Sequence, residues 1–184
     1  MRNFLASALE VFEVAVIAIG AVFLIRNFLV QPFLVSGLSM TPNFHDGDYL
    51  LVDELTYRFR EPERGEVAVF RYPNNESTFF IKRIIGLPGE RVVVKDGQIT
   101  LFNSEYPRGV VLTEDYLPKG IVTSGSGEFE IPQGKYFVLG DNRSYSFDSR
   151  SWGLLEAKEI IGLTRLRLWP LGSLRAFAAP EYGY

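Results

Sequence analysis

Two residues in this sequence have the right chemistry for a nucleophile and its base. The first is Ser39, which lies in Val35–Phe44 between Gly37 and Pro42. Glycine reaches backbone angles closed to other residues, and proline fixes its own φ. Such a turn can hold a hydroxyl out on a stiff loop, as a nucleophile requires. Because these residue types are also common in ordinary loops, the turn alone fits a linker as well.

The candidate base is Lys82, in the stretch Phe-Phe-Ile-Lys-Arg-Ile-Ile at 79–85. Side chains alternate across a strand, so Lys82 shares a face with Phe80 and Ile84. A lysine among apolar neighbours loses hydration, which lowers its pKa from about 10.4. A pKa of about 7–8 suits a general base. The alternative is that Lys82 and Arg83 lie at a sheet edge, where lysine prevents aggregation.

A third stretch, Gly140–Arg150, is dense in side-chain donors and acceptors. Asn, Asp and Ser side chains bond nearby backbone and build rigid loops. We expect Asp148 to pair with Arg150, and Asp141 with Arg143. A polar surface loop is the alternative, but the density of charged and hydroxyl groups favours a structured loop beside a site.

The composition excludes several kinds of site. The 184 residues suit one compact domain with an extra element. The chain has no cysteine, which excludes disulfides, a cysteine nucleophile and thiolate metal sites. A single histidine, His45, excludes a multi-histidine metal centre, and we expect no cofactor. The net charge of −3 gives no electrostatic case for a nucleic-acid partner.

The N-terminal part is the most apolar. Val14–Ile25 is an unbroken apolar run, and Phe4–Val30 can supply the roughly 20 residues that a membrane-spanning helix needs. A cleaved signal peptide would need a small-x-small site after its apolar core, but residues 26–28 are Arg-Asn-Phe. A buried core helix would precede an all-strand chain, and an interfacial helix would be apolar on one face only. We therefore predict a membrane anchor helix over residues 1–32.

The chain from residue 33 to residue 184 has the pattern of a β-rich catalytic domain. Lys95–Gln98 contains Asp-Gly, the signal for a two-residue hairpin turn. Residues 107–127 form a loop-rich excursion. The predicted fold is mainly β, with twisted antiparallel sheets preceded by one transmembrane helix. The expected strands are Tyr49–Asp53, Glu66–Arg71, Thr78–Ile85, Arg91–Val94, Gln98–Phe102, Glu128–Ile131, Lys135–Leu139 and Ile160–Leu168.

Four stretches in this order resemble the sequence boxes of type I signal peptidases. They are Ser-Met-Thr-Pro at 39–42, Arg-Gly-Glu-Val-Ala-Val-Phe at 64–70, Lys-Arg-Ile-Ile-Gly-Leu-Pro-Gly-Glu at 82–90, and Gly140–Arg150. The resemblance runs from about Phe4 to Trp169 and includes the position of the family's membrane anchor. It implies a serine endopeptidase that cleaves membrane-bound preproteins after a small-x-small motif. The implied partners are preproteins with signal peptides, and membrane lipid.

The resemblance also assigns roles and a location. Ser39 would be the nucleophile and Lys82 the general base of a Ser-Lys dyad. The catalytic domain would lie on the extracytoplasmic side of the cytoplasmic membrane, on a single-pass anchor. Supporting roles fall on Met40 packed near the dyad, Ser146 orienting the lysine, Asp148 and Arg150 as an ion pair, and Asp141 opening the last box.

The oxyanion donors are only partly implied. Many bacterial members of the family have a serine two residues before the nucleophile, where its side chain is an oxyanion donor. This chain has Gly37 there, as another branch of the family does. The Ser39 backbone N–H is the expected donor, and a second donor stays open.

Three other functions compete. His45 with Asp46 or Asp48 can be a relay for a serine hydrolase. A self-cleaving Ser-Lys protease of the repressor type would need a DNA-binding helical domain, where this chain has an apolar segment. A membrane-tethered β domain that only binds partners would have no use for a Ser-Lys pair.

Overall fold

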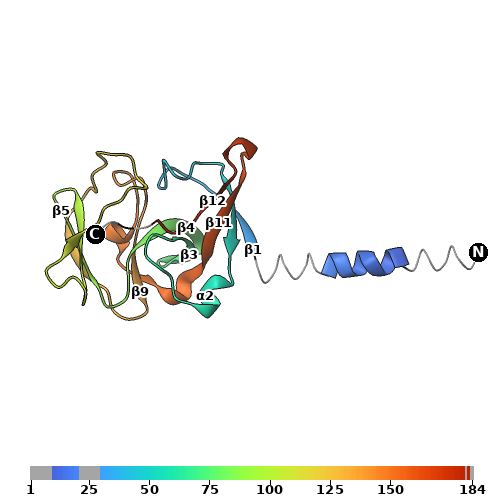
Figure 1. The fold of residues 1–184 in the computed structure, drawn as a ribbon, viewed down its shortest axis with the longest axis horizontal. Coiled ribbons are helices and arrows are strands. Elements are labelled where there is room, and N and C mark those ends of the chain that lie inside the picture. The colour runs from blue at the N-terminus through green and yellow to red at the C-terminus, as the bar shows by residue number, and fades with distance from the viewer. Residues whose placement is uncertain (1–9, 21–29, 181, 183–184) are drawn as a thin grey trace, which may run out of the picture.

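The computed structural model describes residues 10–20, 30–180 and 182. Residues 10–20 are helical, and the rest of the described chain is built mainly from two antiparallel sheets (Figure 1). The mainly β prediction is confirmed. The strands are β1 (Val30–Leu34), β2 (Tyr49–Asp53), β3 (Val67–Tyr72), β4 (Asn75–Gly86), β5 (Arg91–Lys95), β6 (Gln98–Phe102), β7 (Val110–Val111), β8 (Gly127–Glu130), β9 (Lys135–Leu139), β10 (Leu155–Glu156), β11 (Ile160–Trp169) and β12 (Arg175–Ala176).

The two sheets differ in size and in how far apart in sequence their neighbours lie. The larger sheet has the order β1-β2-β11-β3-β4-β9-β10, with β12 paired to β11. The late strand β11 therefore lies between two early ones. The smaller sheet has the order β7-β6-β5-β8. Short helices join the strands: α2 (Thr56–Phe59), α3 (Ser149–Trp152), and the 3-10 turns η1 (Ala157–Glu159) and η2 (Leu171–Ser173).

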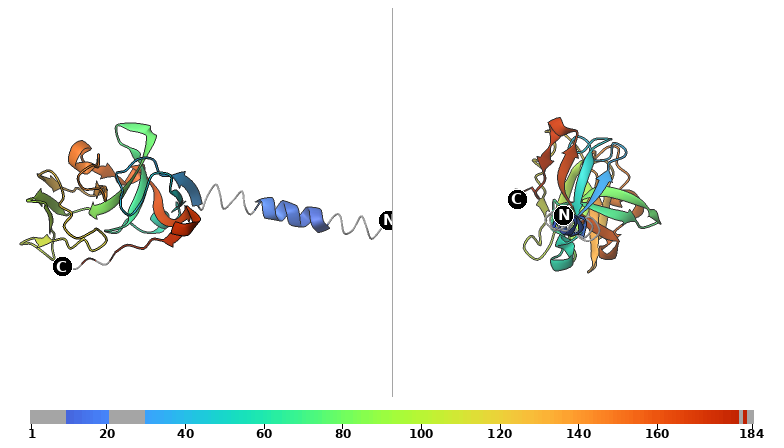
Figure 2. Two further views of the ribbon diagram at one scale, coloured as in Figure 1. Left: turned by 90° about the horizontal axis from the view of Figure 1, so that it is seen from above. Right: turned by 90° about the vertical axis from the view of Figure 1, so that its right-hand side faces the viewer.

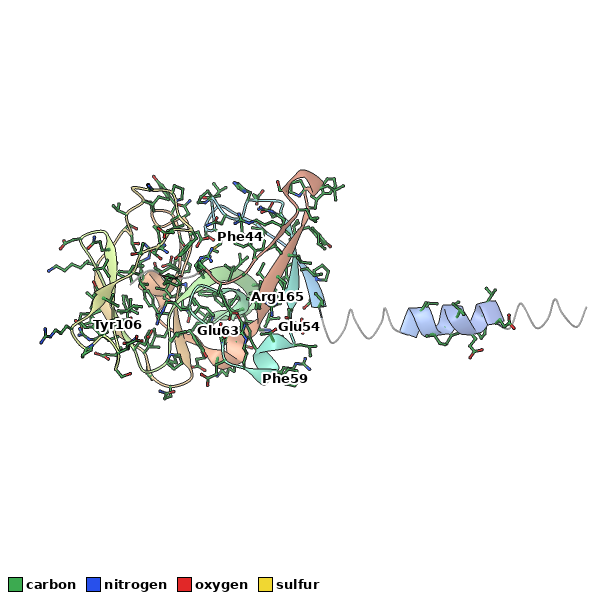
Figure 3. The ribbon with its side chains drawn as sticks, viewed as in Figure 1. Phe44, Glu54, Phe59, Glu63, Tyr106 and Arg165 are labelled. Atoms are coloured by element: carbon green, nitrogen blue, oxygen red, sulfur yellow. The ribbon has the colours of Figure 1, made fainter. Side chains whose placement is uncertain are left out.

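Three apolar clusters hold these elements together. One joins the sheets and includes Ile85 of β4 and Val92 of β5, both fully buried. A second packs on the larger sheet around Phe70 and Val138. The third lies under the loop between β1 and β2, where Phe44 is 0% exposed (Figure 3). The loop that carries Ser39 therefore rests on a packed base.

Beyond β12 the chain runs back along the domain, away from β12 (Figure 2, left). Its residues Pro180 and Tyr182 lie against Gly65, so closely that a Cβ there would be 2.6 Å from Pro180. The Tyr182 ring meets the Tyr116 ring at a centroid distance of 5.9 Å. The tail packs against the folded domain through Pro180 and Tyr182.

The expected strands are present, most with boundaries within one or two residues. Gln98–Phe102 and Lys135–Leu139 have the predicted bounds. The hairpin between β5 and β6 has Asp96 at φ 51° and Gly97 at φ 80°, the positive angles that a type I′ turn requires. β4 begins earlier than expected, at Asn75. The short elements α2, α3, β7, β10 and β12 have too few residues for a periodic pattern to reveal them.

The first strand lies where we predicted the end of the anchor helix. Val30–Leu34 pairs antiparallel with β2, so the last three residues of the expected range 1–32 are strand. The strand was hidden because its apolar residues continue the apolar run before it. Pro32 fits because β1 is an edge strand, whose outer side needs no N–H donor.

The predicted membrane span, Phe4–Val30, falls largely on residues 1–9 and 21–29, outside the described residues. Of the helices that the structure describes, none has the length and apolar character needed to cross a membrane.

Candidate active site

The structure brings the two predicted reactive groups together. The Lys82 Nζ lies 2.7 Å from the Ser39 Oγ and also donates to the Ile81 carbonyl at 2.9 Å. Lys82 comes from the middle of β4, which pairs with β3 on one side and β9 on the other. The pairing with β9 begins at Arg83, but Lys82 is 3% exposed, so it is not the solvated edge lysine of the alternative. The amine is in hydrogen-bond reach of the hydroxyl, as a nucleophile and its base require.

Burial lowers the pKa of the Lys82 amine. Lys82 is only 3% exposed, and its Nζ lies 5.3 Å from the centroid of the Phe80 ring. Desolvation lowers the Lys82 pKa from 10.5 to about 8, although the negative charges of Asp148 and Asp141 oppose this. The lowered pKa agrees with the expectation from the apolar strand. A lysine with this pKa is partly neutral near pH 8 and can accept a proton.

Hydrogen bonds between backbone groups and nearby side chains fix the nucleophile loop. Gly37 has φ +95°, which favours glycine, and its N–H donates to Asp46 Oδ1 at 2.7 Å. The Thr41 hydroxyl donates to the Leu38 carbonyl at 2.9 Å. Met40 is 1% exposed and belongs to the apolar cluster under this loop. Ser39 thus lies in a short hydrogen-bonded turn. Its neighbour Met40 packs into the apolar cluster beneath the turn.

The donors for an oxyanion differ in availability. The Gly37 N–H is already bound to Asp46, so it is not free to stabilise a negative oxygen. Within the described part of the chain, the Ser39 N–H meets no hydrogen-bond acceptor. That Ser39 supplies an oxyanion donor through its own backbone stays a prediction.

One predicted ion pair of the 140–150 loop is present. Arg150 Nε and Nη2 donate to the two carboxylate oxygens of Asp148 at 2.7 and 2.6 Å. Asp148 is fully buried, and its Oδ2 also accepts the Gly140 N–H at 3.0 Å. The Arg150 Nη1 reaches the Arg143 carbonyl at 2.6 Å. This pair ties both ends of the loop together.

The other predicted pair, between Asp141 and Arg143, is wrong. Asp141 accepts from Arg83 Nε at 2.8 Å and from Arg83 Nη2 at 2.6 Å. The reason is the strand register: Arg83 lies opposite Leu139, so its side chain reaches the residues just after β9. Arg83 also lies over the Tyr116 ring, 4.1 Å from the centroid. Sequence proximity pointed to the wrong arginine.

Arg143 instead binds the excursion. Its guanidinium is 1% exposed and forms an ion pair with Glu114. It also donates to the Thr123 hydroxyl at 2.9 Å and to the Tyr116 hydroxyl at 2.8 Å. Charged side chains are almost never so buried unless paired, and here the partners come from residues 107–127. The excursion is thus bound to the loop beside the dyad, a role that its irregular sequence did not reveal.

Asn142 also binds the nucleophile loop, although the sequence analysis did not single it out. Its backbone N–H donates to the Ser39 carbonyl at 3.0 Å. Its side-chain amide donates to the Leu38 carbonyl and to the Thr41 hydroxyl, both at 3.1 Å. The 140–150 loop therefore holds the nucleophile loop on both sides of Ser39. An asparagine in a polar loop carries no sequence signal for such contacts.

Ser146 occupies an unusual place. Its Oγ is buried and has no hydrogen-bond partner among the described residues. It lies so close to Gly140 that a Cβ there would be 2.1 Å from this oxygen. The Lys82 amine donates to the Ser39 hydroxyl and to the Ile81 carbonyl. That Ser146 orients the lysine stays a prediction.

A cleft of about 310 Å³ opens on the dyad. One wall is the stretch 33–39 and the other is 79–82, and Tyr145 and Phe147 close it from the 140–150 loop. The lining is largely apolar, and Phe147 is 52% exposed. Such a cleft suits an apolar peptide segment that presents a carbonyl to Ser39.

The histidine alternative has no support in the geometry. His45 is exposed, and its backbone N–H donates to Asp48 Oδ2 at 2.9 Å. The same Asp48 oxygen accepts from Arg167 Nη1 at 2.6 Å. The Asp46 carboxylate accepts the Gly37 N–H. Both carboxylates that were candidates for orienting the imidazole bind other groups.

A serine hydroxyl beside a buried lysine amine, in an apolar cleft of a β domain, is the arrangement of a serine peptidase with a lysine base. The sequence profile of the family described as "Signal peptidase, peptidase S26" matches residues 8–169. The chain belongs to this family and is a serine endopeptidase.

Two relatives agree with this membership. The chain is similar to signal peptidase IB of Staphylococcus aureus, with 31% identity over 176 residues that cover 90% of this chain and 91% of the relative. It is 36% identical over 161 residues to a probable signal peptidase I-2 of Synechocystis sp., covering 85% and 69%. A crystal structure of a signal peptidase I from Enterococcus faecalis V583 is 32% identical, with a TM-score of 0.47, covering 56% of this chain and 97% of that one.

Proposed function

We propose that this chain removes signal peptides from exported preproteins, with Ser39 as nucleophile and Lys82 as general base. The observation that carries the proposal is the 2.7 Å contact between the Lys82 Nζ and the Ser39 Oγ. No further side chain is needed to relay the proton, because the amine touches the hydroxyl directly.

The chemistry follows from these positions. The neutral Lys82 amine takes the Ser39 proton while the Oγ attacks the scissile carbonyl carbon. The Ser39 N–H donates to the oxygen that becomes negative. The Lys82 ammonium then protonates the leaving amine, which departs as the new N-terminus of the mature chain. In the second half, water attacks the acyl carbon while the neutral Lys82 amine takes its proton. The bond from that carbon to the Ser39 Oγ then breaks, and the Lys82 ammonium returns the proton to the Oγ.

The cleft supports an apolar substrate. The two walls of the cleft, residues 33–39 and 79–82, belong to or continue strands β1 and β4. An extended peptide between them can bury apolar side chains while its carbonyl faces Ser39. The end of a signal peptide, with a small residue before the scissile bond, fits this chemistry.

The N-terminal segment is the proposed membrane anchor. We assign the segment before β1, from about residue 4 to residue 29, as a single span, with the catalytic domain on the extracytoplasmic side of the cytoplasmic membrane. Residues 10–20 are helical, and their apolar side chains are uncovered: Val11 and Ile19 are each 70% exposed. Membrane lipid is the medium that would cover them. The anchor would hold the dyad near the site where signal peptides emerge.

The experiment is a cleavage assay on a preprotein in detergent with the full chain. Ser39→Ala and Lys82→Ala should abolish product formation. The matched control is Ser104→Ala, which removes an exposed hydroxyl outside the lining of the cleft and should leave the rate unchanged. Activity in Ser39→Ala at the wild-type level would sink the proposal.

A further inference from the structure

A second hollow lies on the far side of the nucleophile loop from the cleft. Its volume is about 450 Å³. Three segments meet there: the nucleophile loop, the 140–150 loop and the excursion, which Figure 1 draws in yellow beside the blue loop before β2. The walls include Thr41, Pro42, Pro118, Ile121, Asn142 and Ser144.

The two hollows share their loops but not their residues. Residues 36–39 line the cleft, whereas Thr41 and Pro42 line the second hollow. Tyr145 and Phe147 face the cleft, whereas Asn142 and Ser144 face the hollow. Ser39 therefore stands at the boundary between the two. A peptide chain that lies in the cleft and presents its scissile carbonyl to Ser39 continues toward the hollow.

We propose that this hollow, called here the exit groove, binds the first residues of the mature chain after the scissile bond. The proposal rests on the proposed function, because it takes the cleft as the site of the signal-peptide side. It assigns to the excursion a part in substrate binding, through Ile121 and its neighbours.

The lining defines the chemistry of the ligand. Ile121 is 40% exposed and Val122 is 61% exposed, and both line the groove with two prolines. The charged side chain of the lining is Arg143, which is 1% exposed and paired with Glu114. The groove thus offers apolar surface and hydroxyls without an available charge. It fits an extended, uncharged peptide segment with small or apolar side chains.

The wall made by the excursion is held in place, so the groove exists before a substrate arrives. Asn43 Nδ2 donates to the Tyr116 carbonyl at 3.1 Å, and Thr123 N–H donates to the Gly97 carbonyl at 2.9 Å. The buried Arg143–Glu114 pair joins the excursion to the 140–150 loop. Pre-organisation of this kind lowers the entropic cost of binding.

The first test compares two peptides with the full chain in detergent. They share the same residues before the scissile bond and carry either one residue or about five after it, roughly 17 Å of extended chain. Wild type should cleave the long peptide with a kcat/KM about fivefold to tenfold higher, because burying part of one apolar side chain contributes on that order. Ile121→Asp should remove this gain and leave the rate on the short peptide unchanged.

The matched control is Val111→Asp. Val111 belongs to the same excursion and is 44% exposed, but it lies outside the groove lining. It should keep the full gain for the long peptide. An equal gain in Ile121→Asp would overturn the exit groove, whereas a wild-type chain that cleaves neither peptide would overturn the proposed function itself.

A charge exchange tests direct contact independently of overall activity. Ile121→Lys should prefer a long peptide with one aspartate after the scissile bond, and Ile121→Asp should prefer the same peptide with a lysine there. The ratio of the two rates within each variant should move in opposite directions by about twofold to fivefold, as expected for exposed charge pairs. General loss of activity cancels in this ratio. Equal ratios in both variants would contradict the contact.

Discussion

The backbone N–H of Asn142 donates to the carbonyl oxygen of Ser39 over 3.0 Å, so the 140–150 loop binds the nucleophile residue itself. The Asn142 amide adds bonds to Leu38 and Thr41, on either side of the serine. The 140–150 loop thereby fixes the position of the Ser39 hydroxyl relative to the Lys82 amine.

Removing the Asn142 amide should therefore loosen the nucleophile. In Asn142→Ala, kcat should fall by about tenfold or more, because misplacement near 1 Å can cost about 10². The rate is measured on the short peptide, which does not reach the exit groove. Asn74→Ala removes an amide that bonds only a tyrosine hydroxyl in an exposed turn, and should be silent. Wild-type kcat in Asn142→Ala would mean that the backbone bond suffices.

The pH dependence of cleavage should report the buried lysine. Lys82 must be neutral to accept the Ser39 proton, and burial lowers its pKa to about 8. Hence kcat/KM should rise with pH and level off above about 8. Lys82→Arg should be as inactive as Lys82→Ala, because arginine cannot be deprotonated in proteins. An acid limb near pH 10 would contradict the desolvation of Lys82.

The same burial should make the lysine costly for stability. Between pH about 8 and 10.5 the unfolded chain holds a proton that the folded chain lacks, so stability rises with pH in this window. Below it the cost is fully present and amounts to (10.5 − 8) × about 1.36, or about 3 kcal/mol. Lys82→Met should therefore raise the free energy of unfolding by about 1–3 kcal/mol at pH 7 and by much less above pH 10.

Urea unfolding of the full chain in detergent, at pH 7 and above pH 10, measures this difference. Lys119→Met, which replaces an exposed lysine, is the control and should show no pH-dependent gain. The same gain for Lys82→Met at both pH values would exclude titration of Lys82 as its cause.

Gly140 should tolerate no side chain. A Cβ there would lie 2.1 Å from Ser146 Oγ and 2.3 Å from the Ser39 carbonyl oxygen, closer than real contacts permit. Gly140→Ala should push the nucleophile loop away from Lys82 and lower kcat by about 10² or more, as 1 Å errors can. Gly172→Ala, where the added Cβ meets nothing within 4 Å, should keep full activity. A fully active Gly140→Ala enzyme would show that the loops move apart at no cost to catalysis.

The sequence marked the two residues of the dyad as candidates through local signals, and the family resemblance assigned their roles. Ser39 lies in a glycine–proline turn, and Lys82 interrupts an apolar strand. The pairing of Asp148 with Arg150 was predictable too, since the two are close in the chain. Most strands were found for the same local reason, from alternation and turn residues.

The sequence could not predict contacts that depend on strand order. Arg83 finds Asp141 because β4 lies next to β9, and Arg143 finds Glu114 because the excursion folds over the catalytic loop. Asn142 has no distinguishing neighbours at all. The strand β1 was missed because an apolar run typical of a membrane helix and a partly exposed edge strand use the same residue types.

The position of β11 has a consequence for the folding of this protein during its synthesis. Ser39 precedes β2 and Lys82 lies on β4, but β11 (Ile160–Trp169) is the strand that joins β2 to β3. A ribosome must therefore release nearly the whole chain before the hydroxyl and the amine can be held together. Until then the serine is an ordinary, unactivated hydroxyl, because its base is hydrated and charged. A nascent chain with this strand order therefore has no assembled dyad until β11 has been synthesised and has paired with β2 and β3.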